Sequence, residues 1–253
     1  MISINMTNKI RYFIANWKMY GDLTSLKSIP KVIKFSRLYK TKKLRIIYCP
    51  PYTLLGDFNR IVKKTSIETG AQNIHENFDF GANTGFVNSK MIKNLGVKYV
   101  ILGHSENRAL GEDNKHINNK ILSALKSKLT VILCIGETIT QKKNKKTKTI
   151  LKKQIEVCLK GINKKKRVII AYEPVWSIGT GIIPTNIELK KNLQFIKSIV
   201  SKKIKNYKIL YGGSVNPNNI KKLNEIDLLD GFLIGGASQS SKKLIDIIKK
   251  TFK

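Results

Sequence analysis

Three ionisable residues in this sequence each lie within two residues of the end of a short apolar segment. Lys18 follows Tyr12–Asn16, His104 follows Tyr99–Leu102, and Glu173 directly follows Val168–Tyr172. Carboxylates and imidazoles are the groups that most often transfer protons in enzymes, and an ammonium group stabilises developing negative charge. If these side chains share a site, they suit acid–base chemistry.

Each of these residues also has an ordinary structural interpretation. A Lys after a strand is usually a solvated strand end, a lone His usually makes a structural hydrogen bond, and a Glu before Pro can belong to a plain turn. Two contexts favour function. His104 begins a plausible helical turn, whose dipole disfavours protonation of the ring, and Glu173 follows the apolar segment VIIAY.

Two glycine-rich turns indicate a phosphate site. YGGS at 211–214 and IGGAS at 234–238 follow consecutive apolar segments. Glycine lets backbone N–H groups approach an anion closely, and the start of a following helix adds a favourable dipole. Either turn alone indicates only a tight turn, but the pair on successive strands favours a bound phosphate group.

The segment PVWSIGTG at 174–181, called the lid below, is long for a strand-to-helix loop. A loop that mixes apolar residues with glycines can fold over a ligand and expel water. The alternative is a glycine-rich surface loop, which would leave Val175, Trp176 and Ile178 exposed without a reason.

Eight short strands separated by amphipathic segments must position these residues. The predicted strands are Tyr12–Asn16, Leu44–Cys49, Ser66–Thr69, Tyr99–Leu102, Thr130–Cys134, Val168–Tyr172, Lys208–Tyr211 and Gly231–Ile234. Helical spacing is clearest over Leu23–Leu38, Leu54–Val62, Asn114–Lys126, Ile150–Leu159, Ile187–Ile204 and Leu244–Phe252, with shorter helices at Ser89–Leu95 and Asn218–Leu223. Several strands are apolar throughout, which is typical of parallel strands covered on both faces.

Eight strand–helix alternations in 253 residues predict an α/β fold, a closed (β/α)8 barrel forming one domain over residues 1–253. The alternative is a doubly wound open sheet, which usually carries G-x-G-x-x-G after its first strand. Here the first strand is followed by no glycine until Gly21. The Lys-rich tract at 141–148 is predicted to begin a solvated helix.

The composition excludes several classes of protein. Hydrophobic residues make up 42% of the chain and charged residues 25%, which excludes wholesale disorder. No apolar run reaches the ~20 residues of a membrane span, and MISINMTNKIRYF lacks the apolar core of a signal peptide. Cys49, Cys134 and Cys158 are too few and too scattered for a disulfide framework or a metal site. We therefore expect a cytoplasmic protein.

The formal net charge of +32 arises from 48 Lys and Arg against 16 Asp and Glu. Such an excess suits an anionic partner: nucleic acid, an acidic membrane or a phosphorylated substrate. Only six of the 48 are Arg, the residue that grips phosphates and bases bidentately. We therefore expect a diffuse surface charge and no specific nucleic-acid or membrane partner.

Seven motifs make the sequence resemble the triosephosphate isomerase family from Phe13 to Ser238. They are NWKM (16–19), GAQN (70–73), GHSE (103–106), CIGE (134–137), AYEPVWSIGTG (171–181), YGGSV (211–215) and GFLIGGAS (231–238). The resemblance implies the TIM-barrel fold and interconversion of D-glyceraldehyde 3-phosphate and dihydroxyacetone phosphate through an enediolate, in glycolysis and gluconeogenesis. It implies no metal and no organic cofactor.

The resemblance also implies roles for individual residues. Glu173 would be the base that moves the proton, His104 would polarise the carbonyl, and Lys18 would supply positive charge beside the enediolate. The pairing of a Glu base with a neutral His is known from this same family and is carried over with it. Asn16 would orient the substrate, with Glu106 and Ser105 in support. The phosphate would be held by backbone N–H groups of Gly179, Ser214, Gly235 and Gly236.

A homodimer is implied too, in which the loop at 73–88 enters a pocket of the other subunit. Three positions depart from the family pattern: Phe86 replaces an acidic residue, Asn107 replaces Arg, and the lid exits through Ile182–Pro184. The first two concern the dimer interface and the third concerns lid kinetics.

Two other classes of protein fit less well. A Schiff-base aldolase needs a Lys that points into the barrel, and the predicted strands offer only Lys208 at an edge. A nucleic-acid-binding protein needs clustered Arg, aromatic residues and a binding motif, which the sequence lacks.

Overall fold

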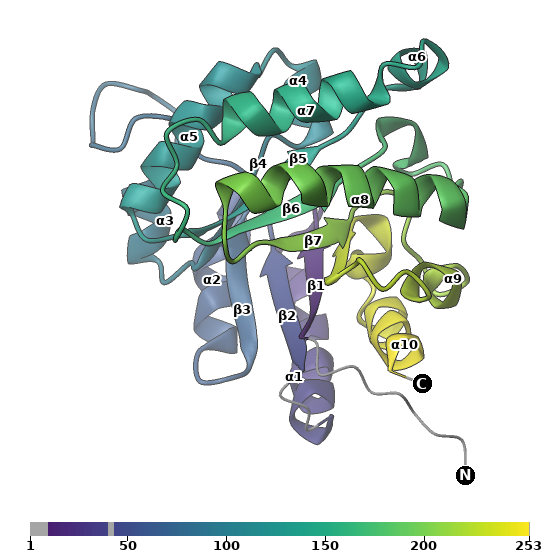
Figure 1. The fold of residues 1–253 in the computed structure, drawn as a ribbon. Coiled ribbons are helices and arrows are strands. Elements are labelled where there is room, and N and C mark those ends of the chain that lie inside the picture. Colours follow the sequence, from purple (N-terminus) through teal and green to yellow (C-terminus); the bar gives the residue numbers. More distant parts are fainter. Residues whose placement is uncertain (1–9, 40–42, 253) are drawn as a thin grey trace.

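In the computed structural model, which describes residues 10–39 and 43–252, eight parallel strands close into a barrel (Figure 1). The strands are β1 (Arg11–Asn16), β2 (Leu44–Cys49), β3 (Ile67–Ala71), β4 (Tyr99–Leu102), β5 (Thr130–Ile135), β6 (Val168–Tyr172), β7 (Lys208–Tyr211) and β8 (Gly231–Ile234). Each pairs with the next, and β8 pairs back with β1, where Ile14 lies opposite Leu233. The predicted closed (β/α)8 barrel is confirmed.

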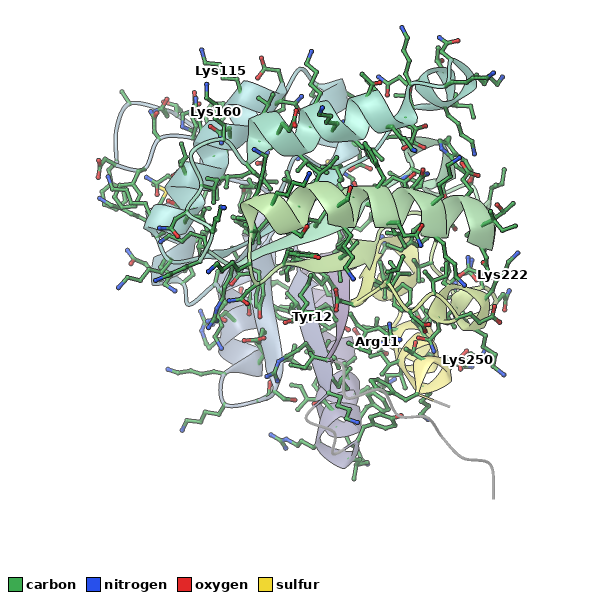
Figure 2. The ribbon with its side chains drawn as sticks, viewed as in Figure 1. Arg11, Tyr12, Lys115, Lys160, Lys222 and Lys250 are labelled. Carbon is green, nitrogen blue, oxygen red and sulfur yellow. The ribbon has the colours of Figure 1, made fainter. Side chains whose placement is uncertain are left out.

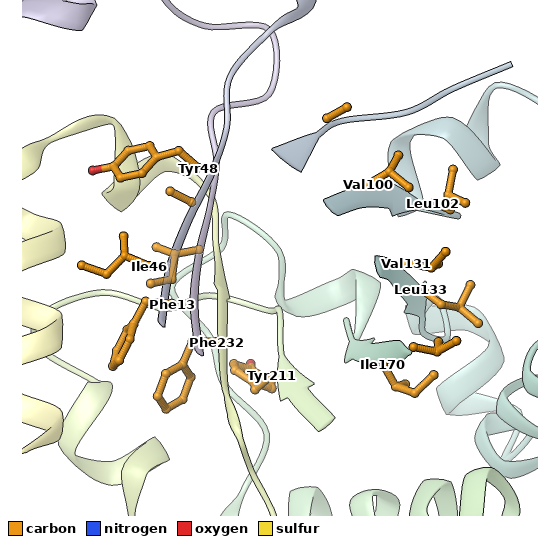
Figure 3. Close-up of a cluster of buried hydrophobic side chains, with 14 of the residues drawn as sticks. Phe13, Ile46, Tyr48, Val100, Leu102, Val131, Leu133, Ile170, Tyr211 and Phe232 are labelled. Atoms are coloured by element: carbon orange, nitrogen blue, oxygen red, sulfur yellow. The ribbon is translucent and has the colours of Figure 1, made fainter. Parts of the chain in front are cut away.

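The strands carry apolar side chains on both of their faces, and successive residues belong in turn to an inner and an outer cluster. Ile14, Ile47 and Ile132 belong to a cluster made of strand residues, which fills the inside of the barrel. Their neighbours, such as Phe13 and Leu133, belong to a larger cluster shared with the helices (Figure 3). Burial on both faces explains why these strands read as almost continuous apolar runs.

Helices surround the barrel and turn their charged faces outward. They are η1 (Leu23–Ser28), α1 (Ile29–Leu38), α2 (Tyr52–Val62), α3 (Ser89–Asn94), α4 (Ser105–Ala109), α5 (Asn114–Lys126), α6 (Ile139–Lys143), α7 (Thr147–Cys158), η2 (Val175–Ser177), α8 (Asn186–Lys203), α9 (Ile220–Asn224), η3 (Gly236–Gln239) and α10 (Ser241–Thr251), where η marks a 3₁₀ helix. Helices α7 and α8 lie side by side (Figure 1). Lys115, Lys160 and Lys222 project from the helical ring into solvent (Figure 2). The amphipathic spacing thus places much of the positive charge on the surface.

Local differences from the sequence prediction have simple causes. The segment 23–38 is two elements, because Pro30 occupies the first turn of α1, where a residue without an N–H starts an α-helix but does not continue one. The basic tract at 141–148 ends α6 and begins α7, with Lys145 at φ 57° in the turn between them. Helix α4 corresponds to the helical turn predicted to begin at His104, whereas the start of α6 at Ile139 was not predicted.

Within the part of the chain that is described, no helix is long and apolar enough to cross a membrane. Most of the N-terminal segment inspected for a signal peptide, residues 1–9, lies outside the described residues.

Candidate active site

A cavity of about 430 Å³ opens at the carboxyl ends of the strands. Its walls include all of the predicted catalytic, substrate-orienting and phosphate-holding residues: Asn16, Lys18, His104, Glu173, Gly179, Ser214, Gly235 and Gly236. Glu106 and Ser105 lie next to it, at the start of α4. Residues from five different strand ends therefore meet in one place, as the barrel topology requires.

Glu173 is the most deeply buried carboxylate of this cavity. Its Oε1 lies 3.6 Å from Nε2 of His104, and no described residue hydrogen-bonds Oε2. Burial raises the pKa of Glu173 above its ordinary value, opposed chiefly by His104, the Cys134 thiol and Lys18. A raised pKa and a free oxygen are the properties of a proton acceptor near neutral pH.

Two glycines make room for Glu173. A Cβ at Gly136 would fall 1.7 Å from the backbone oxygen of Glu173, and a Cβ at Gly212 would fall 2.7 Å from its Cγ. Both distances are far below any real contact. Gly136 of CIGE and Gly212, the first glycine of YGGS, are therefore required by the close approach of this one residue.

The ring of His104 is held in a defined tautomer. His104 caps α4, and its Nδ1 accepts a hydrogen bond from the backbone N–H of Glu106 at 3.3 Å. An accepting Nδ1 carries no proton, so the neutral ring carries its proton on Nε2. This places an N–H donor on the side of the ring that faces Glu173 and the cavity.

Lys18 has a strained backbone at φ 55°, in the left-handed region that non-glycine residues rarely adopt. Asn16 Oδ1 accepts its N–H at 3.0 Å, and Gln72 Nε2 donates to its carbonyl at 2.7 Å. Its ammonium group lies 2.6 Å from Glu106 Oε1, and Oε2 of Glu106 lies 3.6 Å from His104 Nδ1. Glu106 thus lies within 4 Å of both Lys18 and His104. Gln72 belongs to the motif GAQN, and no role was predicted for it from the sequence.

The other end of the cavity is lined by open backbone. A Cβ at Gly179 or Gly236 would meet no described atom within 4 Å, so an anion can reach the backbone there. The N–H of Ser214 donates to Ser177 Oγ at 3.3 Å, which is a weak hydrogen bond that a phosphate oxygen can replace. Lys243 from the first turn of α10 lines the same cavity and was not predicted.

The lid is anchored at its base and free at its tip. Ser177 is buried, shares a hydrogen bond of 2.8 Å with the hydroxyl of Tyr211, and donates to the carbonyl of Ile182. Trp176 donates its indole N–H to Glu137 Oε1 at 3.0 Å. Gly179 at the tip is exposed. Val175, Trp176 and Ile178 of the lid are half-buried, unlike the exposed apolar groups of a plain surface loop. Glu137, Ser177 and Tyr211 were not predicted as anchors.

A second cavity of about 610 Å³ borders Asn16 and Lys18 on the other side. Exposed apolar side chains line this second cavity, among them Met19, Phe86 and Leu110.

Lys208 lines neither cavity. It is the first residue of β7, at the opposite end of the barrel, and its ammonium group lies 3.5 Å from Asp230 Oδ1. This position does not suit a Schiff-base lysine. Among residues 10–39 and 43–252, no group of three or more His, Cys, Asp or Glu could hold a metal ion.

Comparison with known proteins gives the family. The family model described as Triosephosphate isomerase matches residues 11–251. The chain is 40% identical over 246 residues to the triosephosphate isomerase of Thermodesulfovibrio yellowstonii, covering 94% of this chain and 98% of that protein. The chain belongs to the triosephosphate isomerase family.

Other members of the triosephosphate isomerase family agree. The protein of Mycoplasma mobile is 39% identical over 248 residues, covering 94% of this chain and 99% of that protein. The crystal structure of triosephosphate isomerase from Bartonella henselae matches with a TM-score of 0.86 and 31% identity, covering 96% of this chain and 99% of that one. The chain is therefore an isomerase with a TIM-barrel fold.

Proposed function

We propose that this chain, acting as one barrel domain over residues 1–253, interconverts D-glyceraldehyde 3-phosphate and dihydroxyacetone phosphate in glycolysis and gluconeogenesis. The observation that supports this best is the pairing of a buried carboxylate, whose Oε2 no described residue hydrogen-bonds, with an N–H donor 3.6 Å from its other oxygen. Proton abstraction beside a carbonyl needs this combination, because the base removes a proton while a fixed donor stabilises the charge that appears on oxygen.

The reaction follows from the positions of three side chains. Glu173 takes a proton from the carbon next to the carbonyl, and the electrons of that C–H bond move toward the carbonyl oxygen to give an enediolate. His104 donates its Nε2–H to that oxygen, and Lys18 stabilises the negative charge. Glu173 then returns the proton to the former carbonyl carbon, while His104 takes the hydroxyl proton from the other carbon, whose C–O bond becomes the new carbonyl, so both side chains end as they began. No electrons leave the substrate, so the reaction needs no cofactor.

The phosphate group holds the substrate in place for this transfer. Backbone N–H groups of Gly179, Ser214, Gly235 and Gly236 bind it, and Asn16 orients the reacting end. The enediolate can lose phosphate if water reaches it, so closure of the lid over the cavity protects the intermediate. Ser105 supports the site from the start of α4, where its backbone N–H contacts Glu173.

A coupled assay tests the proposal. Purified protein is given D-glyceraldehyde 3-phosphate, and dihydroxyacetone phosphate is measured by its reduction with NADH and glycerol-phosphate dehydrogenase. We expect rapid NADH consumption that is unchanged by EDTA. Folded protein that forms no dihydroxyacetone phosphate would refute the proposal.

We also propose a cytoplasmic homodimer. The loop at 73–88 would enter the second cavity of the other subunit, close to Lys18. Met19 and Leu110 beside this cavity are 94% and 87% exposed, and Phe86 of the loop is 62% exposed. Exposed apolar side chains around a large cavity favour burial against another chain. Phe86 would then supply an apolar contact where relatives use charge.

A further inference from the structure

One lysine contacts both a residue near the start of the lid and a residue in the helix that follows the lid. Trp176, near the beginning of the lid, is held by its indole N–H on Glu137. The ammonium group of Lys142 lies 3.7 Å from the centre of the same indole ring. The same group lies 2.6 Å from Glu188 Oε1, and Glu188 belongs to the first turn of α8, which follows the exit of the lid.

These contacts come from elements that are fixed independently of the lid. Lys142 belongs to α6, whose start is fixed by a capping box between Thr138 and Gln141 and directly follows Glu137. Glu188 is held in α8 by the cap at Thr185, whose Oγ1 accepts the backbone N–H of Glu188 at 3.2 Å. The ion pair therefore joins α6 to α8, and the ammonium group of Lys142 lies over the indole ring of Trp176.

We propose that Lys142 is a positioning residue that favours the open position of the lid when no ligand is bound. This inference rests on the proposed isomerase function, in which the lid closes for the chemistry and opens for release. In the structure Gly179 at the lid tip is exposed and borders the cavity, and a Cβ placed there would meet no described atom within 4 Å, so the tip has room to move. Closure that turns the Trp176 ring must break its contact with Lys142, and Glu188 keeps the ammonium group from following.

The size of the effect can be bounded from exposure. The side chains of Lys142 and Glu188 are each 30% exposed, so their ion pair adds little stability by itself and serves mainly to fix the ammonium group. A cation–π contact at a partly exposed site changes an equilibrium constant by about two- to five-fold. Loss of Lys142 should shift the balance between open and closed lid by that factor, toward closed.

The test compares Lys142→Met with Lys143→Met, which removes the same charge from the next residue of α6, and with Lys142→Arg, which keeps a cation. Protein labelled with 5-fluorotryptophan gives two ¹⁹F signals, from Trp17 and Trp176. Without ligand, Lys142→Met should shift and broaden the Trp176 signal and leave Trp17 unchanged, while the two other variants resemble the wild type.

Binding and kinetics give a second measurement. The probe is 2-phosphoglycolate, whose carboxylate resembles the enediolate. Its Kd, and KM with it, should fall about two- to five-fold in Lys142→Met only, while kcat does not rise. Equal behaviour of Lys142→Met and Lys143→Met, or weaker binding in Lys142→Met, would overturn the proposal. Because the ligand-free ¹⁹F comparison needs no turnover, a wild type without isomerase activity would refute the proposed function separately.

Discussion

Replacing Glu173 by Gln should make the protein much slower and, at neutral pH, more stable. The carboxylate is buried, no described residue hydrogen-bonds Oε2, and burial raises its pKa. Keeping this group ionised at pH 7 therefore costs folding free energy. A neutral amide of the same shape avoids that cost, because it has no charge to desolvate.

The expected gain follows from the buried charge. Each unit by which burial raises the pKa of a carboxyl group costs about 1.4 kcal/mol of stability above that pKa, and a neutral amide has no such cost, so the free energy of unfolding should rise by on the order of 1 kcal/mol at pH 7–8. For a chain of this size, that is about 2–4 °C in Tm for each kcal/mol. This gain assumes that the Gln side chain keeps the rotamer of Glu173 and makes no new unfavourable contact.

The dependence on pH has a definite sign. The folded pKa of Glu173 lies above the ordinary value of 4.5, so the folded protein holds this proton more tightly than the unfolded chain. The stability contributed by the group is fully present below the unfolded pKa and is lost as pH rises through the folded pKa. The advantage of Glu173→Gln should therefore be largest at neutral pH and shrink on acidification.

Activity should move in the opposite direction. Loss of a general base lowers kcat by about 10²–10⁴, with little change in the Kd of 2-phosphoglycolate. In the wild type, kcat/KM should fall on acidification with an apparent pKa above the ordinary Glu value, because only the ionised base reacts. Thermal unfolding and the coupled assay, run on both proteins from pH 5 to 8, check this. Near-wild-type turnover would refute the base, and a variant less stable than wild type at pH 8 would refute the argument from burial.

Four further outcomes are expected. Lys18→Met should weaken 2-phosphoglycolate binding and also lower kcat, because the cation acts on bound anion and intermediate alike; unchanged values for both would make Lys18 a solvated strand end. Lys243→Gln should raise KM by about two- to five-fold while Lys242→Gln, an equal charge loss outside the cavity walls, should not; equal effects would mean that only net charge matters. Sedimentation at micromolar concentration should show a dimer, and a fully active monomer would contradict the interface proposed around Phe86. The value of kcat/KM should fall as salt shortens the Debye length from ~30 Å at 0.01 M to ~8 Å at 0.15 M. Tight, sequence-selective binding of oligonucleotides at 0.15 M salt would instead show that the +32 charge has a specific partner.

The fold could be predicted because its strands are buried on both faces. Val168–Tyr172 and Thr130–Ile135 are nearly all apolar, and a pattern of this kind between amphipathic helices leaves few architectures. The helix boundaries were harder. Pro30 moves the start of α1 to Ile29, and the five-residue helices α4 and α6 are too short to show a helical period.

Most of the predicted walls of the cavity follow a strand end directly, and strand ends are local features that a sequence shows; Lys243, which comes from α10, was not predicted. The supports could not be predicted, because their contacts join distant segments. Gln72 reaches the carbonyl of Lys18 across 54 residues, and Ser177 reaches the hydroxyl of Tyr211 across 34. Gln72 lies in the motif GAQN and Ser177 in the motif AYEPVWSIGTG, but the motifs alone do not predict which distant groups these side chains hydrogen-bond.

Hydrogen-bond donors, and not burial alone, distinguish the buried carboxylate that does chemistry from the one that anchors the lid. Glu137 is as buried as Glu173, and its pKa is also raised by burial, but Trp176 and Tyr172 donate hydrogen bonds to it. These donors stabilise the ionised form of Glu137 and occupy its oxygens, so the oxygens are not available to a ligand. Because one of the donors is Trp176, Glu137 anchors the lid instead. Glu173 faces a cavity and keeps Oε2 free of any described donor. The large positive charge lies mostly outside, where water and salt screen it. It should therefore govern how often an anionic substrate arrives, while the desolvated carboxylate governs what happens after the lid closes.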